Sequence, residues 1–135
     1  MFKLSNNNEL GKELRMAVVD SLKEVMASDE SVVALDADLG AASGWSNIKK
    51  DFPDRFINVG ISEANMVGLS AGLSLTNHKP FIHTFSPFAT RRVFDQLYIS
   101  GGYSQNNITI YGSDPGFTAG PNGGTHTSWE DVALV

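Results

Sequence analysis

The chain has 135 residues, of which 41% are hydrophobic and 19% are charged, and its formal net charge is −5. This size and balance predict one globular domain with a buried core, not a disordered chain. An acidic chain without a cluster of lysines and arginines is a poor nucleic-acid binder. The lack of cysteine excludes disulfide frameworks, thiolate zinc sites and cysteine nucleophiles. No uncharged stretch could cross a bilayer, and residues 1–8 lack a secretion signal, so we expect a cytoplasmic protein with no membrane contact.

Strand and helix signals alternate along the sequence. The first helix is predicted over residues 9–27, where apolar residues recur at three- and four-residue steps. A short apolar run at 32–35 predicts a buried strand, which ends in the acidic loop 36–40. The remaining predicted elements are a loop with a short helix at 41–54, strands at 55–60, 80–85 and 108–111, helices at 63–76 and 90–99, and a glycine-rich loop at 112–125. This alternation, without hairpin turns, predicts an α/β fold with a mostly parallel sheet flanked by helices.

The last residues have the pattern of a helix that has only begun. Ser128 has the character of an N-cap, Glu130 and Asp131 are acids of a first turn, and 132–135 is an apolar run. So short a helix is not stable without further packing. We therefore expect 1–135 to be one domain that is truncated at its C-terminal end, as a piece of a larger protein.

Ligands of open parallel sheets bind beyond the carboxyl ends of the strands. Four segments are expected at that edge, and the side chains of interest in them are Asp38, Glu63, Phe85, Phe88 and His126. Two carboxylates, two aromatic rings and an imidazole at one edge indicate a site for a flat heteroaromatic cofactor.

Each of these residues also has an ordinary structural explanation. Glu63 would be an acid in the first turn of a helix that Ser62 caps. Phe85 and Phe88 would pack in the core, although a turn at Ser86-Pro87 would point both rings toward a cleft. The alternatives for the other two are a strand-end turn for Asp38 and a solvated loop for His126. A face of small residues around Gly68 and Gly72 permits close helix packing, either within the chain or across a subunit interface.

From Arg15 to Val135, the chain resembles the pyrimidine-binding domain of transketolase. Four segments carry the resemblance: Leu-Asp-Ala-Asp-Leu-Gly at 35–40, Asn-Val-Gly-Ile-Ser-Glu-Ala-Asn-Met at 58–66, Pro-Phe-Ile-His-Thr-Phe-Ser-Pro-Phe at 80–88 and Gly-Gly-Thr-His at 123–126. Their order and spacing together are specific. The resemblance implies the thiamine-diphosphate-binding (pyrimidine) fold and thiamine diphosphate as the cofactor.

The resemblance also implies roles for individual residues. Glu63 would hydrogen-bond N1′ of the aminopyrimidine ring, held protonated by an apolar site, and so promote cofactor activation. Phe88 would stack on the ring, with Phe85 beside it, and Arg91 would lie next to the ring. Asp38 and Leu39 would line the cofactor cleft. His126 would face the thiazolium and the substrate.

The chain departs from the family pattern near the expected substrate site. Ala42 and Asp114 stand where transketolases acting on phosphosugars place a serine and a histidine, whereas Arg15 matches the arginine of that cluster. Gly124 replaces a frequent proline, and Asn122 replaces a common aspartate. The pattern at Asp114 is also similar to that of deoxyxylulose-phosphate synthase. By resemblance, Arg15 and Asp114 are the predicted substrate-binding residues.

The family binds the diphosphate and Mg²⁺ through a Gly-Asp-Gly…Asn motif on a separate domain, and no Gly-Asp-Gly occurs in this chain. No metal ligand is therefore expected here, and a diphosphate-binding transketolase subunit or domain is the expected partner in a homo- or hetero-oligomer such as a dimer. The implied protein is the first part of a split C-terminal transketolase subunit, inactive alone. The assembled transferase of carbohydrate metabolism would move a two-carbon ketol unit between sugar-like substrates. The alternatives are an enzyme like deoxyxylulose-phosphate synthase and a non-catalytic α/β dimerisation module.

Overall fold

A computed structural model describes residues 9–135, and its centre is a parallel sheet of four strands in the order β2-β1-β3-β4. The strands are β1 (Val32–Asp36), β2 (Phe56–Asn58), β3 (Lys79–Phe85) and β4 (Thr109–Ser113). In the register, Ala34 lies opposite Phe56 and Asp36 opposite His83. The predicted α/β fold with a parallel sheet is confirmed. The prediction about a secretion signal in residues 1–8 lies outside the described residues.

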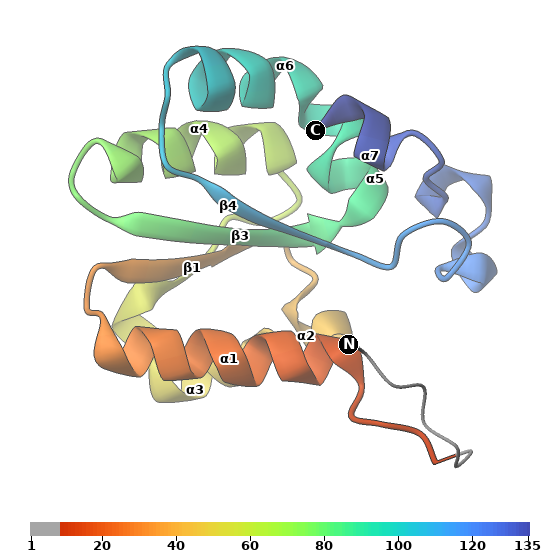
Figure 1. Cartoon of the computed structure of the whole chain (residues 1–135), viewed down its shortest axis with the longest axis horizontal. Coiled ribbons are helices and arrows are strands. Elements are labelled where there is room, and N and C mark those ends of the chain that lie inside the picture. Colours follow the sequence, from red (N-terminus) through yellow and green to blue (C-terminus); the bar gives the residue numbers. More distant parts are fainter. Residues whose placement is uncertain (1–8) are drawn as a thin grey trace, which may run out of the picture.

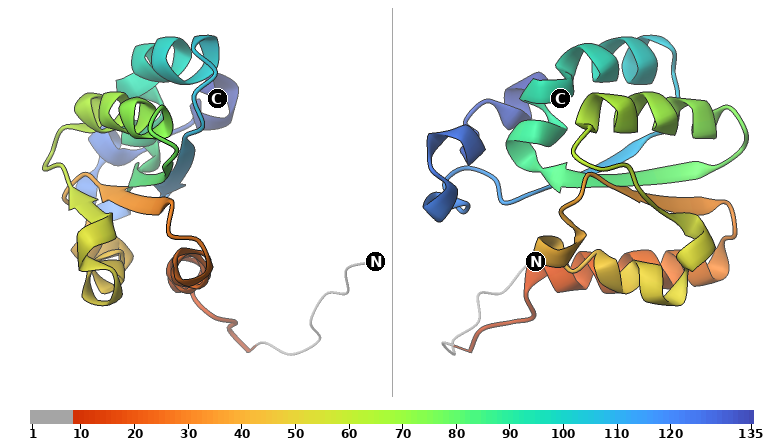
Figure 2. Two further views of the ribbon diagram at one scale, coloured as in Figure 1. Left: turned by 90° about the vertical axis from the view of Figure 1, so that its left-hand side faces the viewer. Right: turned by 180° about the vertical axis from the view of Figure 1, so that it is seen from behind.

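Helices cover both faces of the sheet (Figure 1). On one face lie α1 (Leu14–Ser28) and α3 (Ser46–Asp51), and on the other α4 (Glu63–Ser74) with α6 (Phe94–Gln96) and the π-helical turn η3 (Leu97–Tyr103). Figure 2 shows the same three layers from the side and from behind. The short elements between them are α2 (Gly40–Ser43), η1 (Pro53–Arg55), α5 (Ser86–Ala89), η2 (Arg91–Val93), η4 (Gly120–Asn122), η5 (Gly124–His126) and α7 (Asp131–Leu134).

The central strand β1 is buried on both faces, and its side chains alternate between two cores. Val32 and Ala34 pack toward α1 and α3, with Trp45 completely buried among them. Val33 and Leu35 pack toward α4, against Met66 and other residues of that helix. This explains why β1 appears in the sequence as an uninterrupted apolar run.

Several predicted details differ from the structure. The helix expected at 90–99 is divided into η2, α6 and η3, and the turn expected at Ser86-Pro87 is the start of α5. Ser128 does not cap the last helix, because α7 begins only at Asp131. The Ser128 hydroxyl instead donates to the Asp131 carboxylate at 2.9 Å and accepts from the amide of Gly116.

Gly68 and Gly72, on the small-residue face of α4, do not pack against the described part of the chain. A Cβ atom built at Gly68 or at Gly72 would meet no atom within 4 Å outside its own helix backbone and chain neighbours. Close helix packing inside the domain is therefore not the reason for these glycines, which leaves the subunit interface as the remaining hypothesis. Among residues 9–135, no helix is both long and apolar enough to cross a membrane.

Candidate functional site

Except for Arg15, which lies in α1, the predicted site residues lie in segments at or just after the carboxyl ends of β1, β2, β3 and β4. Because all four strands are parallel, these segments gather at the same edge of the sheet, at the right in Figure 1. Among the predicted site residues, Glu63 is the most deeply buried.

Glu63 is the first residue of α4, and it is only 4% exposed. Its place in the first turn agrees with the prediction, but the expected cap is wrong. The side chain of Ser62 makes no capping hydrogen bond and instead donates from Oγ to the carbonyl oxygen of Val59 at 2.8 Å.

Arg92, which the sequence did not single out, contacts Glu63 directly. Its Nη1 donates to Glu63 Oε1 at 2.6 Å. The resemblance implies an apolar site around Glu63, and the structure adds this ion pair to its surroundings. The Arg92 guanidinium carbon also lies 3.7 Å from the centroid of the Phe88 ring, in a cation–π contact. The guanidinium thus touches both the carboxylate and the flat face of the phenylalanine.

Phe85, Phe88 and His126 form one aromatic cluster, as the sequence predicted. The centroid of Phe88 lies 6.2 Å from that of Phe85 and 5.0 Å from that of His126, with the imidazole nearly perpendicular to the ring. The two phenylalanines are close because α5 starts at once after β3, with Pro87 in its first turn. Phe85 is buried, whereas Phe88 is half-buried. His126 belongs to the single turn η5, where Thr125 Oγ1 lies 2.9 Å from its Nδ1.

Arg91 points to a different part of the chain from Arg92. It donates to Glu130 Oε1 at 2.9 Å and to the carbonyl of Thr127 at 3.4 Å. These bonds connect η2 to the segment that follows His126. The structure thus gives Arg91 a link to the His126 segment, while its predicted contact with a cofactor ring stays a prediction.

Asp38 and Leu39 lie in the tight loop after β1. Asp38 has a φ of 63°, a left-handed conformation that aspartate tolerates better than most residues, and Asn58 Nδ2 donates to its Oδ1 at 3.0 Å. The backbone amide of Leu39 donates to Asp36 Oδ2 at 2.9 Å. Asp38 and Glu63 have separate polar partners, so the two carboxylates do not form a pair.

A buried polar network supports this loop, and the sequence analysis missed it. Asp36 Oδ1 lies 2.8 Å from His83 Nδ1, and His83 Nε2 lies 3.1 Å from the hydroxyl of Ser113. The His83 ring is stacked on Trp45 with centroids 5.0 Å apart. The signal of this network in the sequence was a histidine within a mostly apolar strand.

The two predicted substrate-binding residues lie close together. Arg15 Nη1 is 3.8 Å from Asp114 Oδ2 and donates to the carbonyl of Ala42 at 3.1 Å. The hydrogen bond to Glu13, followed by the charge of Asp114, raises the pKa of Arg15 above its ordinary value. Asp114 Oδ2 is buried and has no hydrogen-bond partner among the described residues, and the residue has a φ of 53°. The positive charge of Arg15 therefore lies between the carboxylates of Glu13 and Asp114.

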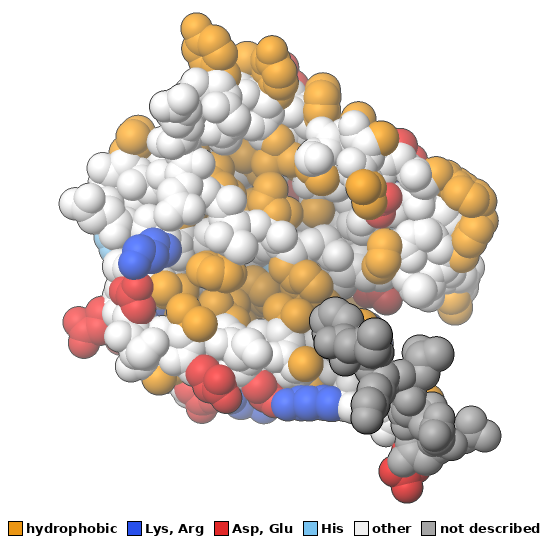
Figure 3. All heavy atoms as spheres, viewed as in Figure 1, with side chains coloured by type: hydrophobic (Ala, Val, Ile, Leu, Met, Phe, Trp, Pro, Cys, Tyr) orange, Lys and Arg blue, Asp and Glu red, His pale blue; other side chains and the backbone are white. Residues whose placement is uncertain are grey.

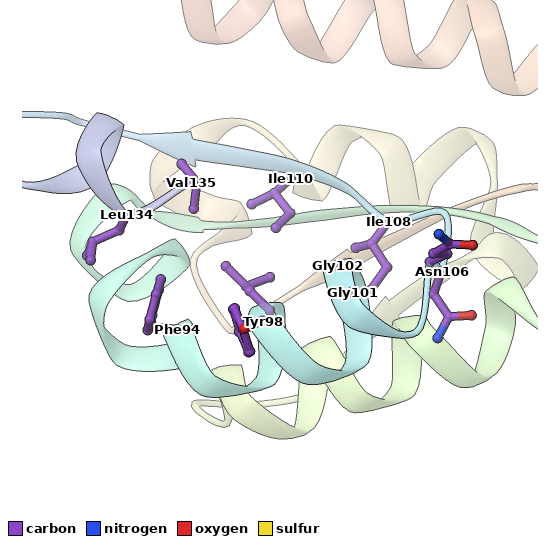
Figure 4. Close-up of a pocket in the computed structure, with 11 residues that line it drawn as sticks. Phe94, Tyr98, Gly101, Gly102, Asn106, Ile108, Ile110, Leu134 and Val135 are labelled. Atoms are coloured by element: carbon purple, nitrogen blue, oxygen red, sulfur yellow. The ribbon is translucent and has the colours of Figure 1, made fainter.

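The larger cavities lie away from Glu63, on either side of the edge strand β4. One, of about 690 Å³, lies between α1 and β4 and has Arg15 and Asp114 among its otherwise mainly apolar lining. The other, of about 500 Å³, lies between η3 and β4 and ends at Leu134 and Val135 (Figure 4). Figure 3 shows apolar side chains gathered in this region of the surface. Neither lining includes Glu63, Phe88 or His126.

The donor set of the site suits an organic ring better than a metal. No group of three or more His, Asp or Glu side chains in residues 9–135 could hold a metal ion. By contrast, the buried carboxylate of Glu63 and the ring of Phe88 hold a planar cationic group, the guanidinium of Arg92, and the imidazole of His126 lies beside Phe88. These residues therefore fit a flat nitrogen-containing ring such as an aminopyrimidine.

Comparison with known proteins agrees with this geometry. Residues 11–135 match the family model described as "Transketolase, pyrimidine binding domain". The 6-deoxy-6-sulfo-D-fructose transketolase subunit SqwH of Clostridium sp. (strain MSTE9) is 49% identical over 122 residues, which are 90% of this chain and 38% of the relative. An apulose-4-phosphate transketolase subunit from Phocaeicola vulgatus is 33% identical over 121 residues, 90% of this chain and 39% of the relative.

A solved structure described as "Split gene transketolase, inactive beta4 tetramer" superimposes with a TM-score of 0.76 at 37% identity, covering 89% of this chain and 38% of that one. The chain thus spans about two fifths of the length of each of these three proteins. The family model covers nearly the whole sequence, and its description agrees with the resemblance drawn from the four sequence segments. This chain belongs to the transketolase family, as a pyrimidine-binding domain.

Proposed function

We propose that this chain provides the pyrimidine-binding half of a thiamine-diphosphate-dependent transketolase, which transfers a two-carbon ketol unit between sugar-like substrates. The observation that carries the proposal is the position of Glu63. Its side chain is only 5% exposed, lies at the carboxyl end of the sheet and already binds a planar nitrogen group that rests on Phe88. An aminopyrimidine needs the same two contacts.

Each residue of the site has a defined part in this proposal. Glu63 hydrogen-bonds the ring nitrogen N1′ and orients the ring, and Phe88 supplies the stacking face, with Phe85 behind it. His126 holds its imidazole next to Phe88, where it donates a hydrogen bond to the substrate. Asp38, Leu39 and Arg91 line the cleft. Thiamine diphosphate supplies the nucleophilic carbon that adds to the ketose carbonyl.

We propose that the diphosphate and Mg²⁺ bind to a partner subunit or domain, and that the site forms between the two in a homo- or hetero-oligomer such as a dimer. Three observations support this division. The sequence has no Gly-Asp-Gly, and residues 9–135 contain no metal-binding cluster. The two relatives described above are named as transketolase subunits. The isolated chain is then inactive, and the assembled enzyme works in carbohydrate metabolism in the cytoplasm.

We also propose that the domain continues beyond Val135, as the first part of a split C-terminal subunit. In the described residues, β4 pairs with β3 on one side only. The cavities of about 690 and 500 Å³ flank it on both faces, and most of their lining is apolar. A further strand next to β4, with a helix on each face, would bury this surface. The matched relatives have the additional length that this requires.

For the substrate, we propose a ketose that ends in an anionic group, which Arg15 binds. The relatives are named for 6-deoxy-6-sulfo-D-fructose and apulose-4-phosphate, and both of these are such sugars. Asp114 lies 3.8 Å from Arg15 and would repel a phosphate dianion more strongly than a sulfonate monoanion. Steady-state kinetics with a sulfoketose and a phosphoketose would test this, and equal specificity for both would contradict it.

The proposed function is tested by reconstitution. The chain, extended to its natural end, is combined with a diphosphate-binding subunit, Mg²⁺ and thiamine diphosphate, and ketol transfer from a ketose donor is measured. A synthase of the deoxyxylulose-phosphate type would use pyruvate instead, and this alternative has less support because the relative at 49% identity is a transketolase subunit. A dimerisation module without catalytic function would bind no cofactor in calorimetric titration of the assembly.

A further inference from the structure

Arg92 occupies the position that the cofactor ring would need, if the proposed function is correct. Its guanidinium carbon is 3.7 Å from the Phe88 centroid, which is van der Waals contact. No ring can enter between two groups at this distance. The same guanidinium donates to Glu63 Oε1 at 2.6 Å, so it also uses the carboxylate that would bind N1′.

The guanidinium of Arg92 resembles the aminopyrimidine ring of the cofactor in its chemistry as well as in its position. A guanidinium is planar, presents N–H donors along its edge and stacks on aromatic faces. An aminopyrimidine shares all three properties. The two therefore compete for one carboxylate oxygen and for one face of Phe88.

The backbone around Arg92 is fixed, whereas its side chain is free to move. Val93, the next residue, is 1% exposed and packs in the core between the sheet and α4. Thr90 donates from its hydroxyl to the carbonyl of Ser86, which fixes the start of η2. The Arg92 side chain is 43% exposed, and its only described polar partner is Glu63. It can thus leave Phe88 by rotation of its own side chain, without any change in the fold.

We propose that Arg92 is a competitor for the cofactor-ring site, which must swing away from Phe88 and Glu63 before the ring binds. The inference rests on the proposed function, because it takes Glu63 and Phe88 as the ring-binding residues. Its consequence is that removal of the Arg92 side chain strengthens binding of the ring. A residue that helped to hold the ring would have the opposite effect.

The test is a titration of the full chain with 4-amino-5-hydroxymethyl-2-methylpyrimidine, the free ring portion of the cofactor, followed by NMR chemical shifts. This probe isolates the ring site, because it has no diphosphate and needs no Mg²⁺. We expect Arg92→Ala to bind it about tenfold more tightly than the unchanged chain, since the ion pair with Glu63 and the cation–π contact with Phe88 no longer have to be broken. The control Lys49→Ala removes the same charge from α3 on the other face of the sheet and should leave the affinity unchanged.

Arg92→Lys provides a second variant if Arg92→Ala does not fold. Lysine pairs with Glu63 but has no flat face to stack on Phe88. The affinity of Arg92→Lys for the pyrimidine should therefore lie between those of the unchanged chain and of Arg92→Ala. If Arg92→Ala and Arg92→Lys bind the pyrimidine as tightly as the unchanged chain or more weakly, Arg92 is not a competitor, whereas the ring site itself is not contradicted. No binding by any of the chains, also when each is assembled with the diphosphate-binding partner, would overturn the ring site itself, and with it the proposed function.

Discussion

Asp36 and His83 are opposite each other on the neighbouring strands β1 and β3, with Asp36 Oδ1 and His83 Nδ1 2.8 Å apart. Both side chains are buried, at 1% and 0% exposure. The second carboxylate oxygen of Asp36 accepts hydrogen bonds from the backbone amides of Leu39 and Gly40. One buried carboxylate thus connects the centre of the sheet to the loop that carries Asp38 and Leu39.

Asp36→Asn should destabilise the domain by about 3 kcal/mol. The change removes the charge that faces His83 and puts an amide donor among groups that already donate, which leaves buried polar atoms without partners. Urea unfolding followed by circular dichroism measures the loss. Asp38→Asn is the matched control, because Asp38 is exposed and asparagine also tolerates its φ of 63°. Equal effects of the two substitutions would contradict the role given to Asp36.

Glu63→Gln should lower the turnover of the assembled enzyme by about 10²- to 10⁴-fold, the range for loss of a group that handles a proton. Glutamine keeps the size and one acceptor oxygen, so a change in folding does not explain the loss. Turnover is measured with saturating thiamine diphosphate. Glu24→Gln, on the exposed face of α1, should leave turnover unchanged. Near-normal turnover of the Glu63 variant would reject its proposed role.

Asp131 should stabilise the C-terminal segment in a pH-dependent way. Hydrogen bonds from the hydroxyls of Ser86, at 2.7 Å, and Ser128, at 2.9 Å, lower the pKa of Asp131 below its ordinary value of 3.8. A lowered native pKa means that the contribution is complete above the unfolded value, near pH 4, and disappears as the pH falls through the native pKa.

The melting temperatures of the unchanged chain and of Asp131→Asn, compared from pH 7 to pH 2, test this. The chain with aspartate should melt higher at neutral pH, and the difference should vanish in acid. Asp54→Asn, in the exposed turn η1, controls for the general effect of removing a negative charge. A difference that stays constant with pH would show that protonation of Asp131 is not its cause.

Gly112 should be essential for packing and Gly68 should not. A Cβ at Gly112 would lie 3.1 Å from Ser86 Cα and 3.3 Å from Ala89 Cβ, where β4 meets α5. Gly112→Val should therefore cost about 1–3 kcal/mol from overpacking. Gly68→Ala should stabilise the isolated chain by up to about 1 kcal/mol, because alanine favours a helix and meets no neighbour. Urea midpoints measure both, and a destabilised Gly68→Ala chain would contradict the open position of that helix face.

Much of the fold was predictable because the signals were local. The apolar run that became β1 and the helical period that became α1 each depend on a few neighbouring residues. The order of strands and helices was enough to predict a parallel sheet. The helix predicted at 90–99 failed for the opposite reason. Its shape depends on how Val93 and Leu97 enter the core beside α4, and a propensity pattern does not contain that contact.

The candidate site, like the fold, was predictable from the sequence only in part. The sequence by itself determined the fold class, the family and the grouping of Glu63, Phe85, Phe88 and His126 at one edge, since parallel strands bring their carboxyl ends together. Only the tertiary structure decided which charges meet. It paired Arg92 and not Arg91 with Glu63, turned Arg91 to Glu130 and buried Asp36 against His83. The reason is physical: an ion pair depends on the direction of two side chains from different elements, to within about an ångström, and no periodicity along the chain encodes that distance.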